Sequence, residues 1–416
     1  MRFTFRPWRL SRLKAAQAWR ITDQVASRSR RHSAAVSVVI VTIRGNSRSA
    51  KRPRRDRAVL SVVIGLILFA TVQVATGVAI QTEWSPLRDP LYFDATALLH
   101  KHRAFYPGLA SAPDKPVTVL LVGSSRMLNA ADAQAATRIV TEQVHRPVEV
   151  FNFGQAGAGP ITNAVYLQRL QRDGAKPDFV LIEIHPVFLA GQRSVLPESR
   201  WLLPFRLSPE ELPVVRQLGF PAETPASHGC RGFIAPLYEY RFLILDRYTP
   251  YFLMNNCRMN GGRTNDDYGF SRLEEAVTTD RRATLLSKTK RQYVVYCTGY
   301  RPTGPGVTAI RAILEHCQAA GWQAGLVLMP ESSELRSWYS PEGLRELDAL
   351  LAKLSADYRV PVFDAREWVA DPLSEDGHHL TGVGADVFTE RLAREALTPW
   401  ILRTLDSLPG QSRHEE

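Results

Sequence analysis

The stretch VTVLLVGSSRMLNA, residues 117–130, joins an apolar run to a polar turn. The branched and apolar side chains of 117–123 predict a buried strand, and the chain then turns through Gly123, Ser124, Ser125 and Arg126 into a helix. Two interpretations of the serines are open at this point. The serines either form a turn with a helix cap, or they place a nucleophile at the carboxyl end of the strand.

The same order of strand and helix recurs along the chain, and this sets the fold class. Five short apolar runs predict strands, and amphipathic segments with Gly stops or Ser caps follow them. Near-continuous apolar strands that alternate with helices are typical of a parallel sheet covered on both faces. We therefore predict an α/β, flavodoxin-like three-layer sandwich of about five parallel strands. The predicted strands are 117–123, 148–154, 178–184, 323–330 and 360–365, and the helices are 131–144, 161–174, 306–321, 340–358 and 381–397.

The alternation pauses between residues 187 and 300, which we interpret as one mainly helical insertion in a domain spanning 117–400. A Ser208 cap followed by Glu residues predicts a helix start there. The aromatic segment YEYRFLILDRYTPYFLM, residues 238–254, is too short and too interrupted by charges and Pro250 for a membrane span. We expect it to be helical and packed on the main body, and we expect 401–416 to form a C-terminal tail.

Charge is distributed unevenly, which excludes a nucleic-acid function for the folded body. The net charge of +11 arises in residues 1–57, which hold 16 of the 52 Lys and Arg residues and 2 of the 41 Asp and Glu residues. Residues 58–80 follow without a charge and are long enough for a transmembrane helix, and 81–116 form a connector. The excess of Arg before this helix predicts a disordered cytoplasmic tail and an extracytoplasmic C-terminal domain.

The four cysteines do not have metal-binding spacing. An extracytoplasmic location permits disulfides, and a pair between Cys230 and Cys257 is one option. Cys317 falls in a helical pattern and is expected to be a small core residue. Cys297 is left without an assignment.

Chemistry in an open parallel sheet is expected beyond the carboxyl ends of the strands. Ser125 follows the first strand, and a serine there needs a base within hydrogen-bond reach to act as a nucleophile. His379 is the candidate base, because Asp376 precedes it by three residues and could orient its ring. The alternative for Ser125 is a helix cap. The alternatives for Asp376 and His379 are a solvated loop or half of a metal site. Without a further ligand set of zinc spacing, we expect no metal.

The segment NFGQAGAGP, residues 152–160, follows the second strand. It is either a turn that needs glycine or an anion hole in which small residues let backbone N–H groups approach an oxyanion. It does not match a dinucleotide fingerprint, so we expect no cofactor.

These three blocks, in this order, resemble the SGNH/GDSL hydrolase superfamily. Gly123-Ser124-Ser125 matches its first block with Ser in place of Asp, 152–157 matches the second, and Asp376-Gly377-His378-His379 matches the last. The resemblance covers about 117–184 and 305–400. It implies a Ser125, His379, Asp376 triad and an oxyanion hole formed by the N–H groups of Ser125 and Gly157. His378 is expected to face elsewhere.

One block departs from the family. After the third strand, 184–187 reads Ile-His-Pro-Val where the family has an Asn that donates to the oxyanion. His185 and Arg126 are candidate replacements, and together with Asn152 they are candidate substrate contacts.

The anchor and the G-S-S triplet resemble the envelope branch of the family, which includes D-alanyl transfer and alginate O-acetylation proteins. This implies a single-pass protein of the bacterial inner membrane with its N-terminus inside. The implied activity is that of an esterase or O-acyltransferase on acyl esters of an envelope glycan or glycolipid, with a membrane-bound acyltransferase as a partner. A non-catalytic glycan-binding or assembly module with this fold is the alternative.

Overall fold

A computed structural model describes residues 54–82, 85–107, 115–191, 210–220, 235–254 and 264–407, together with positions 198, 202, 206–208 and 258. The chain divides into two compact units. The sheet unit comprises Pro90–Leu202, Pro213–Ala222 and Asn260–Glu416, and the anchor unit comprises Met1–Asp89, Leu203–Leu212 and Glu223–Met259. Most of the predicted basic tail and the cysteines Cys230 and Cys257 lie outside the described residues.

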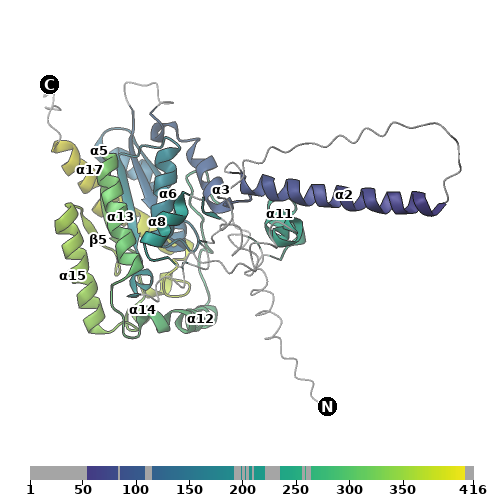
Figure 1. Cartoon of the computed structure of the whole chain (residues 1–416). Coiled ribbons are helices and arrows are strands. Elements are labelled where there is room, and N and C mark those ends of the chain that lie inside the picture. Colours follow the sequence, from purple (N-terminus) through teal and green to yellow (C-terminus); the bar gives the residue numbers. More distant parts are fainter. Residues whose placement is uncertain are drawn as a thin grey trace, which may run out of the picture. The chain divides into compact units, whose positions relative to one another are not determined.

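The sheet unit is built on five parallel strands, which confirms the predicted α/β class (Figure 1). Their order is β2-β1-β3-β4-β5, so the chain moves from β1 to one side and then returns to the other. Every residue of β1 and β3 is buried, because helices cover both faces. The strands are β1 (Val117–Val122), β2 (Val148–Asn152), β3 (Phe179–Ile184), β4 (Gln323–Leu328) and β5 (Val362–Asp364).

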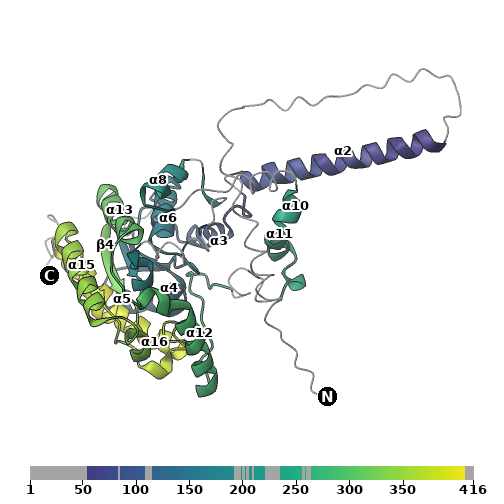
Figure 2. The same ribbon diagram turned by 60° about the horizontal axis from the view of Figure 1, so that its bottom comes forward.

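Two helical layers enclose the sheet (Figures 1 and 2). One layer contains α5 (Ala133–Val144), α16 (Gly382–Arg391), the π-helical turn η9 (Leu392–Leu397) and α17 (Thr398–Asp406), and the other contains α6 (Pro160–Arg172), α13 (Pro305–Ala320) and α15 (Pro341–Tyr358). Alternate residues of a strand pack against opposite helical layers. Val119 and Leu121, for example, join the core beneath α5 and α16.

Local sequence signals explain where these helices begin and end. The Ser340 hydroxyl accepts the N–H of Gly343 at 3.0 Å and starts α15. Gly321 adopts φ +75° and ends α13. The remaining helices of the sheet unit are α3 (Pro90–Leu99), η1 (Arg103–Phe105), α4 (Ser125–Ala130), η2 (Pro186–Leu189), α12 (Thr279–Cys297), α14 (Ser333–Arg336) and η8 (Asp371–Leu373). Helix α8 (Glu211–Gln217) follows the predicted start near Ser208.

The anchor unit contains α2 (Arg54–Gln81), and its stretch Asp56–Ile80 is long and apolar enough to cross a membrane. Helix α10 (Pro236–Glu239) lies beside it, and α11 (Arg241–Tyr248) and η5 (Pro250–Phe252) follow α10 in turn. The segment 238–254 is therefore helical as predicted. It falls in the unit of α2, however, and not in the main body on which we expected it to pack.

Other predictions differ in detail. The predicted insertion 187–300 divides between the two units, since α12 belongs to the sheet unit and α10 and α11 to the anchor unit. Helix α17 continues to Asp406, past the predicted domain end at 400. Cys317 is a buried free thiol, as expected, and so is Cys297.

Candidate active site

The carboxyl ends of β1 and β3 form the point where the strand order reverses, which is the usual place for a site in an open parallel sheet. The turn after β1 is tight. A Cβ on Gly123 would lie 2.4 Å from Glu183 Oε2, so only glycine fits against this carboxylate of β3. Ser124 then caps α4, because its hydroxyl accepts the N–H of Arg126 at 3.1 Å. This turn makes Ser125 the first residue of α4.

Three predicted residues meet at this edge although 254 positions separate the first from the last. Ser125 Oγ lies 2.8 Å from His379 Nε2, and His379 Nδ1 lies 2.9 Å from Asp376 Oδ2. Ser125 is half-buried, and the His379 side chain is 22% exposed. The hydroxyl and the base are therefore within hydrogen-bond distance at a place that solvent reaches.

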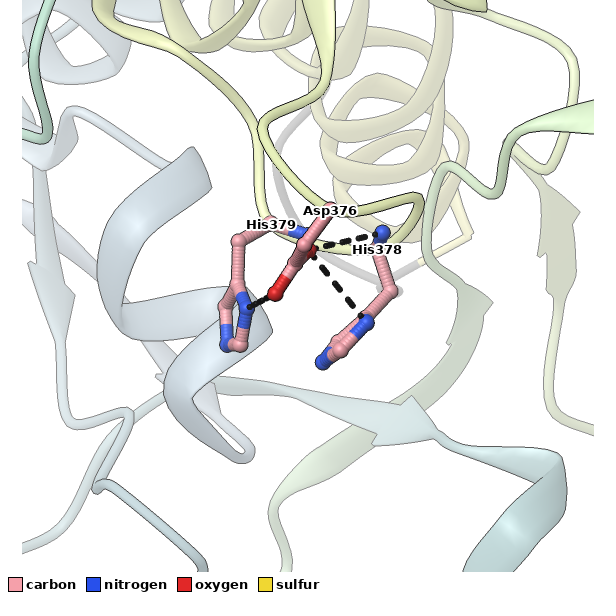
Figure 3. A group of neighbouring side chains, drawn as sticks. All are labelled: Asp376, His378 and His379. Atoms are coloured by element: carbon pink, nitrogen blue, oxygen red, sulfur yellow. Dashed lines mark hydrogen bonds and ion pairs between the residues drawn. The ribbon is translucent and has the colours of Figure 1, made fainter. Parts of the chain in front are cut away.

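The loop that carries Asp376 fixes its orientation. In this loop, between β5 and α16, Asp376 Oδ1 accepts the backbone N–H groups of His379 at 2.9 Å and His378 at 3.2 Å. Figure 3 shows the three residues. Burial opposes ionisation of the carboxyl. The adjoining His379 ring and the hydrogen bonds that His379 donates outweigh it, and the pKa of Asp376 lies well below its ordinary value. Asp376 is thus a fixed anion behind the His379 ring.

A buried ionic network supports the turn from beneath. Glu183 Oε2 accepts the Ser124 N–H at 2.6 Å, and Glu183 Oε1 accepts the Ser124 hydroxyl at 3.0 Å. Arg126 is 1% exposed, and its Nη1 lies 3.1 Å from Glu331 Oε1 while its Nε lies 3.8 Å from Glu183. Burial raises the pKa of Glu331, although Arg126 opposes this. Neither carboxylate was predicted from the sequence to support the site. A lone Glu in the apolar strand FVLIEI was the available signal.

The three candidate substrate contacts take up internal roles instead. Arg126 Nη2 donates to the carbonyls of Met329 and Pro330 at 2.9 and 3.0 Å. His185 Nδ1 accepts from Arg126 Nη1 at 3.1 Å, and burial together with Arg126 holds the pKa of His185 well below its ordinary value. Asn152 is 1% exposed. Its Nδ2 donates to the carbonyls at both ends of the Met127–Ala131 segment, each at 2.8 Å. These groups brace α4 and the chain after β3 and β4, and they do not lie on an open surface.

His378 also differs from expectation, because it does not face away from the site. It is 4% exposed, and its ring packs edge-on against Tyr293 and at 4.1 Å between centroids against His379. Its Nδ1 lies 3.4 Å from Asp376 Oδ1 without a hydrogen bond. Burial lowers the pKa of His378 to about 3, so the ring is neutral.

Asp376, His378 and His379 also form a donor set whose ligand atoms lie within 4.8 Å of one another (Figure 3). A metal ion held there would replace the hydrogen bond between Asp376 and His379. The absence of a metal stays a prediction.

Gly157 lies in the loop between β2 and α6 and adopts φ +74°, which favours glycine. Within the described residues no hydrogen bond links it to Ser125 or His379. Its part in an oxyanion hole therefore remains a prediction.

A family model described as a protein of unknown function (DUF1574) matches residues 67–199. No curated protein matches the chain.

Several solved structures are similar to the chain at low identity. A psychrotrophic esterase from Pseudoalteromonas sp. is 11% identical with a TM-score of 0.34, and the match covers 69% of this chain and 99% of that one. A GDSL-like lipase from Bacteroides thetaiotaomicron is 12% identical with a TM-score of 0.34, covering 74% and 99%. A carbohydrate acetylesterase family member from Sinorhizobium meliloti is 11% identical with a TM-score of 0.32, covering 70% and 99%.

Proposed function

We propose that this protein is a membrane-anchored serine esterase or O-acyltransferase of the SGNH type that acts on acyl esters of a cell-envelope glycan or glycolipid. The observation that carries the proposal is the continuous relay from Ser125 Oγ through His379 to Asp376, with both hydrogen bonds below 3 Å. A serine in hydrogen-bond contact with a carboxylate-oriented imidazole is the arrangement that activates a hydroxyl for acyl transfer.

The reaction follows from the relay. His379 Nε2 takes the Ser125 proton as Oγ attacks the acyl carbonyl, and Asp376 holds the ring with its Nδ1–H toward the carboxylate. The N–H groups of Ser125 and Gly157 stabilise the oxyanion. When the intermediate collapses, His379 protonates the departing alcohol and leaves an acyl-Ser125 ester. Water or a sugar hydroxyl then gives its proton to His379 as its oxygen attacks the acyl carbonyl, and His379 returns that proton to Ser125 Oγ when the ester bond to the serine breaks.

The proposed location in the cell rests on α2. Its apolar residues are largely exposed in the isolated chain, which a lipid environment would explain. The arginines before it favour a cytoplasmic N-terminus and an extracytoplasmic sheet unit in the inner membrane. An enzyme tethered there would meet envelope glycans and glycolipids, and a membrane-bound acyltransferase would be a suitable acyl donor.

A non-catalytic glycan-binding or assembly module is the second candidate. The observation in its favour is that Ile184-His185-Pro186 stands where the resembled family has a donor Asn, with His185 Nδ1 engaged by Arg126. Loss of one oxyanion donor costs on the order of 10²–10³ in rate.

Labelling of the full chain with a fluorophosphonate probe separates the two. We expect wild-type protein and the Ser333→Ala control, an exposed serine of α14, to be labelled, and Ser125→Ala not to be. Glycan binding without labelling of the wild type would support the module. Mass spectrometry of envelope glycans from a Ser125→Ala strain would identify the acyl substituent.

A further inference from the structure

The anchor unit carries exposed apolar side chains on the segment 237–254, which begins on α10 beside α2. Tyr251 and Phe252 are 71% and 72% exposed, and their rings contact each other at 4.6 Å between centroids. We call the whole group the aromatic surface, and its members are Leu237, Tyr238, Tyr248, Tyr251, Phe252 and Met254. Helix α11 has no buried residue although its sequence is RFLILDRY. Large exposed apolar surfaces mark interaction sites on proteins.

Contacts between α10 and the C-terminal part of α2 place the start of this segment along the helix (Figure 2). The N–H of Leu237 donates to Gln73 Oε1 at 3.2 Å, and Gln73 is 5% exposed. Tyr240 packs with Ile80 and Leu87. Gln73 is a polar residue inside the apolar stretch, so the contact with α10 satisfies a group that lipid could not.

The length of α2 gives the depth of this contact. A hydrocarbon core of about 30 Å takes about 20 helical residues, so a span entering just after Arg57 leaves near residue 77. Gln73 then lies about 6 Å below that boundary and Ile80 about 4 Å beyond it, at 1.5 Å per residue. Interfacial helices bury their apolar faces to a similar depth, about 5–10 Å.

We propose that residues 236–254 form an interfacial element that inserts the aromatic surface among the lipid headgroups of the bilayer that α2 crosses. The inference rests on the membrane anchoring in the proposed function and adds a second membrane contact. Tyrosine suits this depth, because its ring is apolar and its hydroxyl can reach water. Arg241 lies over the rings of Tyr238 and Phe242 at 4.0 and 4.5 Å, which keeps a cation at the headgroup level.

Photolabelling of the full chain tests this. The protein is placed in nanodiscs of phosphatidylethanolamine and phosphatidylglycerol with a few per cent of a diazirine-bearing lipid, irradiated, and digested with trypsin. Peptide 248–258 reports the aromatic surface, and peptide 58–88 reports α2. Peptides 292–311 and 395–403 are controls, since Val295 and Leu402 are exposed apolar residues of the sheet unit at 48% and 38%.

We expect peptide 248–258 to carry at least tenfold more lipid adduct than either control peptide, and Tyr251→Asp/Phe252→Asp to remove most of that adduct without changing the labelling of 58–88. Labelling of 58–88 alone would overturn the interfacial element and leave the anchor standing. If neither peptide is labelled, the anchor itself is wrong and the inference falls with it. The wild-type measurement decides the question even if the double variant does not fold.

Discussion

Replacing Asp376 by Asn tests the relay most directly, because it changes one atom and keeps the loop. Asp376 Oδ1 accepts two backbone N–H groups, at 2.9 and 3.2 Å, and the amide oxygen of Asn can continue to do so. That orientation points the amide nitrogen at His379 Nδ1, which Oδ2 now faces at 2.9 Å. Because the amide nitrogen donates, Nδ1 must become the acceptor and the ring proton moves to Nε2.

The consequence for Ser125 follows from the tautomer. With a proton on Nε2, His379 cannot accept the Ser125 proton across the 2.8 Å contact. A change of this kind in a serine protease triad lowers kcat by about 10⁴, which corresponds to about 5.5 kcal/mol in the activation free energy. We expect a loss of similar size in kcat/KM.

The assay is hydrolysis of p-nitrophenyl acetate by the full chain in nanodiscs, with thermal unfolding measured in parallel. Asp371→Asn is the matched control, because Asp371 is a half-buried carboxylate that accepts the Ser333 N–H at 2.9 Å, and among the described residues no hydrogen bond or ion pair links it to the triad. It should stay within about threefold of wild type. If Asp376→Asn kept a tenth or more of the wild-type rate while the native protein hydrolyses the ester, the tautomer argument would be refuted.

Three further predictions concern the surroundings of the site. Gly157→Ala places a side chain at φ +74° and should lower kcat by about 10², because the N–H of residue 157 would move off the oxyanion. Gly174→Ala is the control, at φ +90° with open space around it. It should cost the same backbone strain of about 1–2 kcal/mol without lowering the rate. Glu183→Gln removes the charged acceptor of two Ser124 hydrogen bonds and should lower the free energy of unfolding in urea by about 2 kcal/mol; an unchanged unfolding midpoint would argue against the network. Burial raises the pKa of Glu198 from 4.5 to about 7, so the folded state holds a proton that the unfolded state releases, and stability should fall by about 3 kcal/mol as pH rises through this window. Glu198→Gln should abolish that slope in urea titrations between pH 4.5 and 7, and an equally steep slope in the variant would contradict the assignment.

Much of the fold follows from local pattern. The apolar run 117–122 forms a strand because its side chains fit a surface buried on both faces. The Ser340 cap and the Gly321 stop mark helix ends because they act on backbone groups a few residues away. The placement of Ser125, Asp376 and His379 also followed from the sequence, since parallel strands bring their carboxyl ends to one edge.

Residues whose role depends on what lies behind them could not be assigned this way. Arg126 was expected to meet substrate, but Glu331 and two carbonyls from the end of β4 enclose it. His378 was expected to turn away, yet Tyr293 from α12 covers it beside Asp376. The composition of 238–254 predicted a helix packed on the main body, but the segment falls in the unit of α2.

The sequence by itself determined the strands, the order of the candidate site blocks and the apolar helix α2, because these depend on periodicity and chain order. Only the tertiary structure decided which charges are buried, which carboxylate supports the Ser124 turn and where the segment 236–254 lies. The physical reason is that burial and ion pairing depend on atoms from distant segments, such as the 59 positions between Ser124 and Glu183, and no local pattern encodes those contacts.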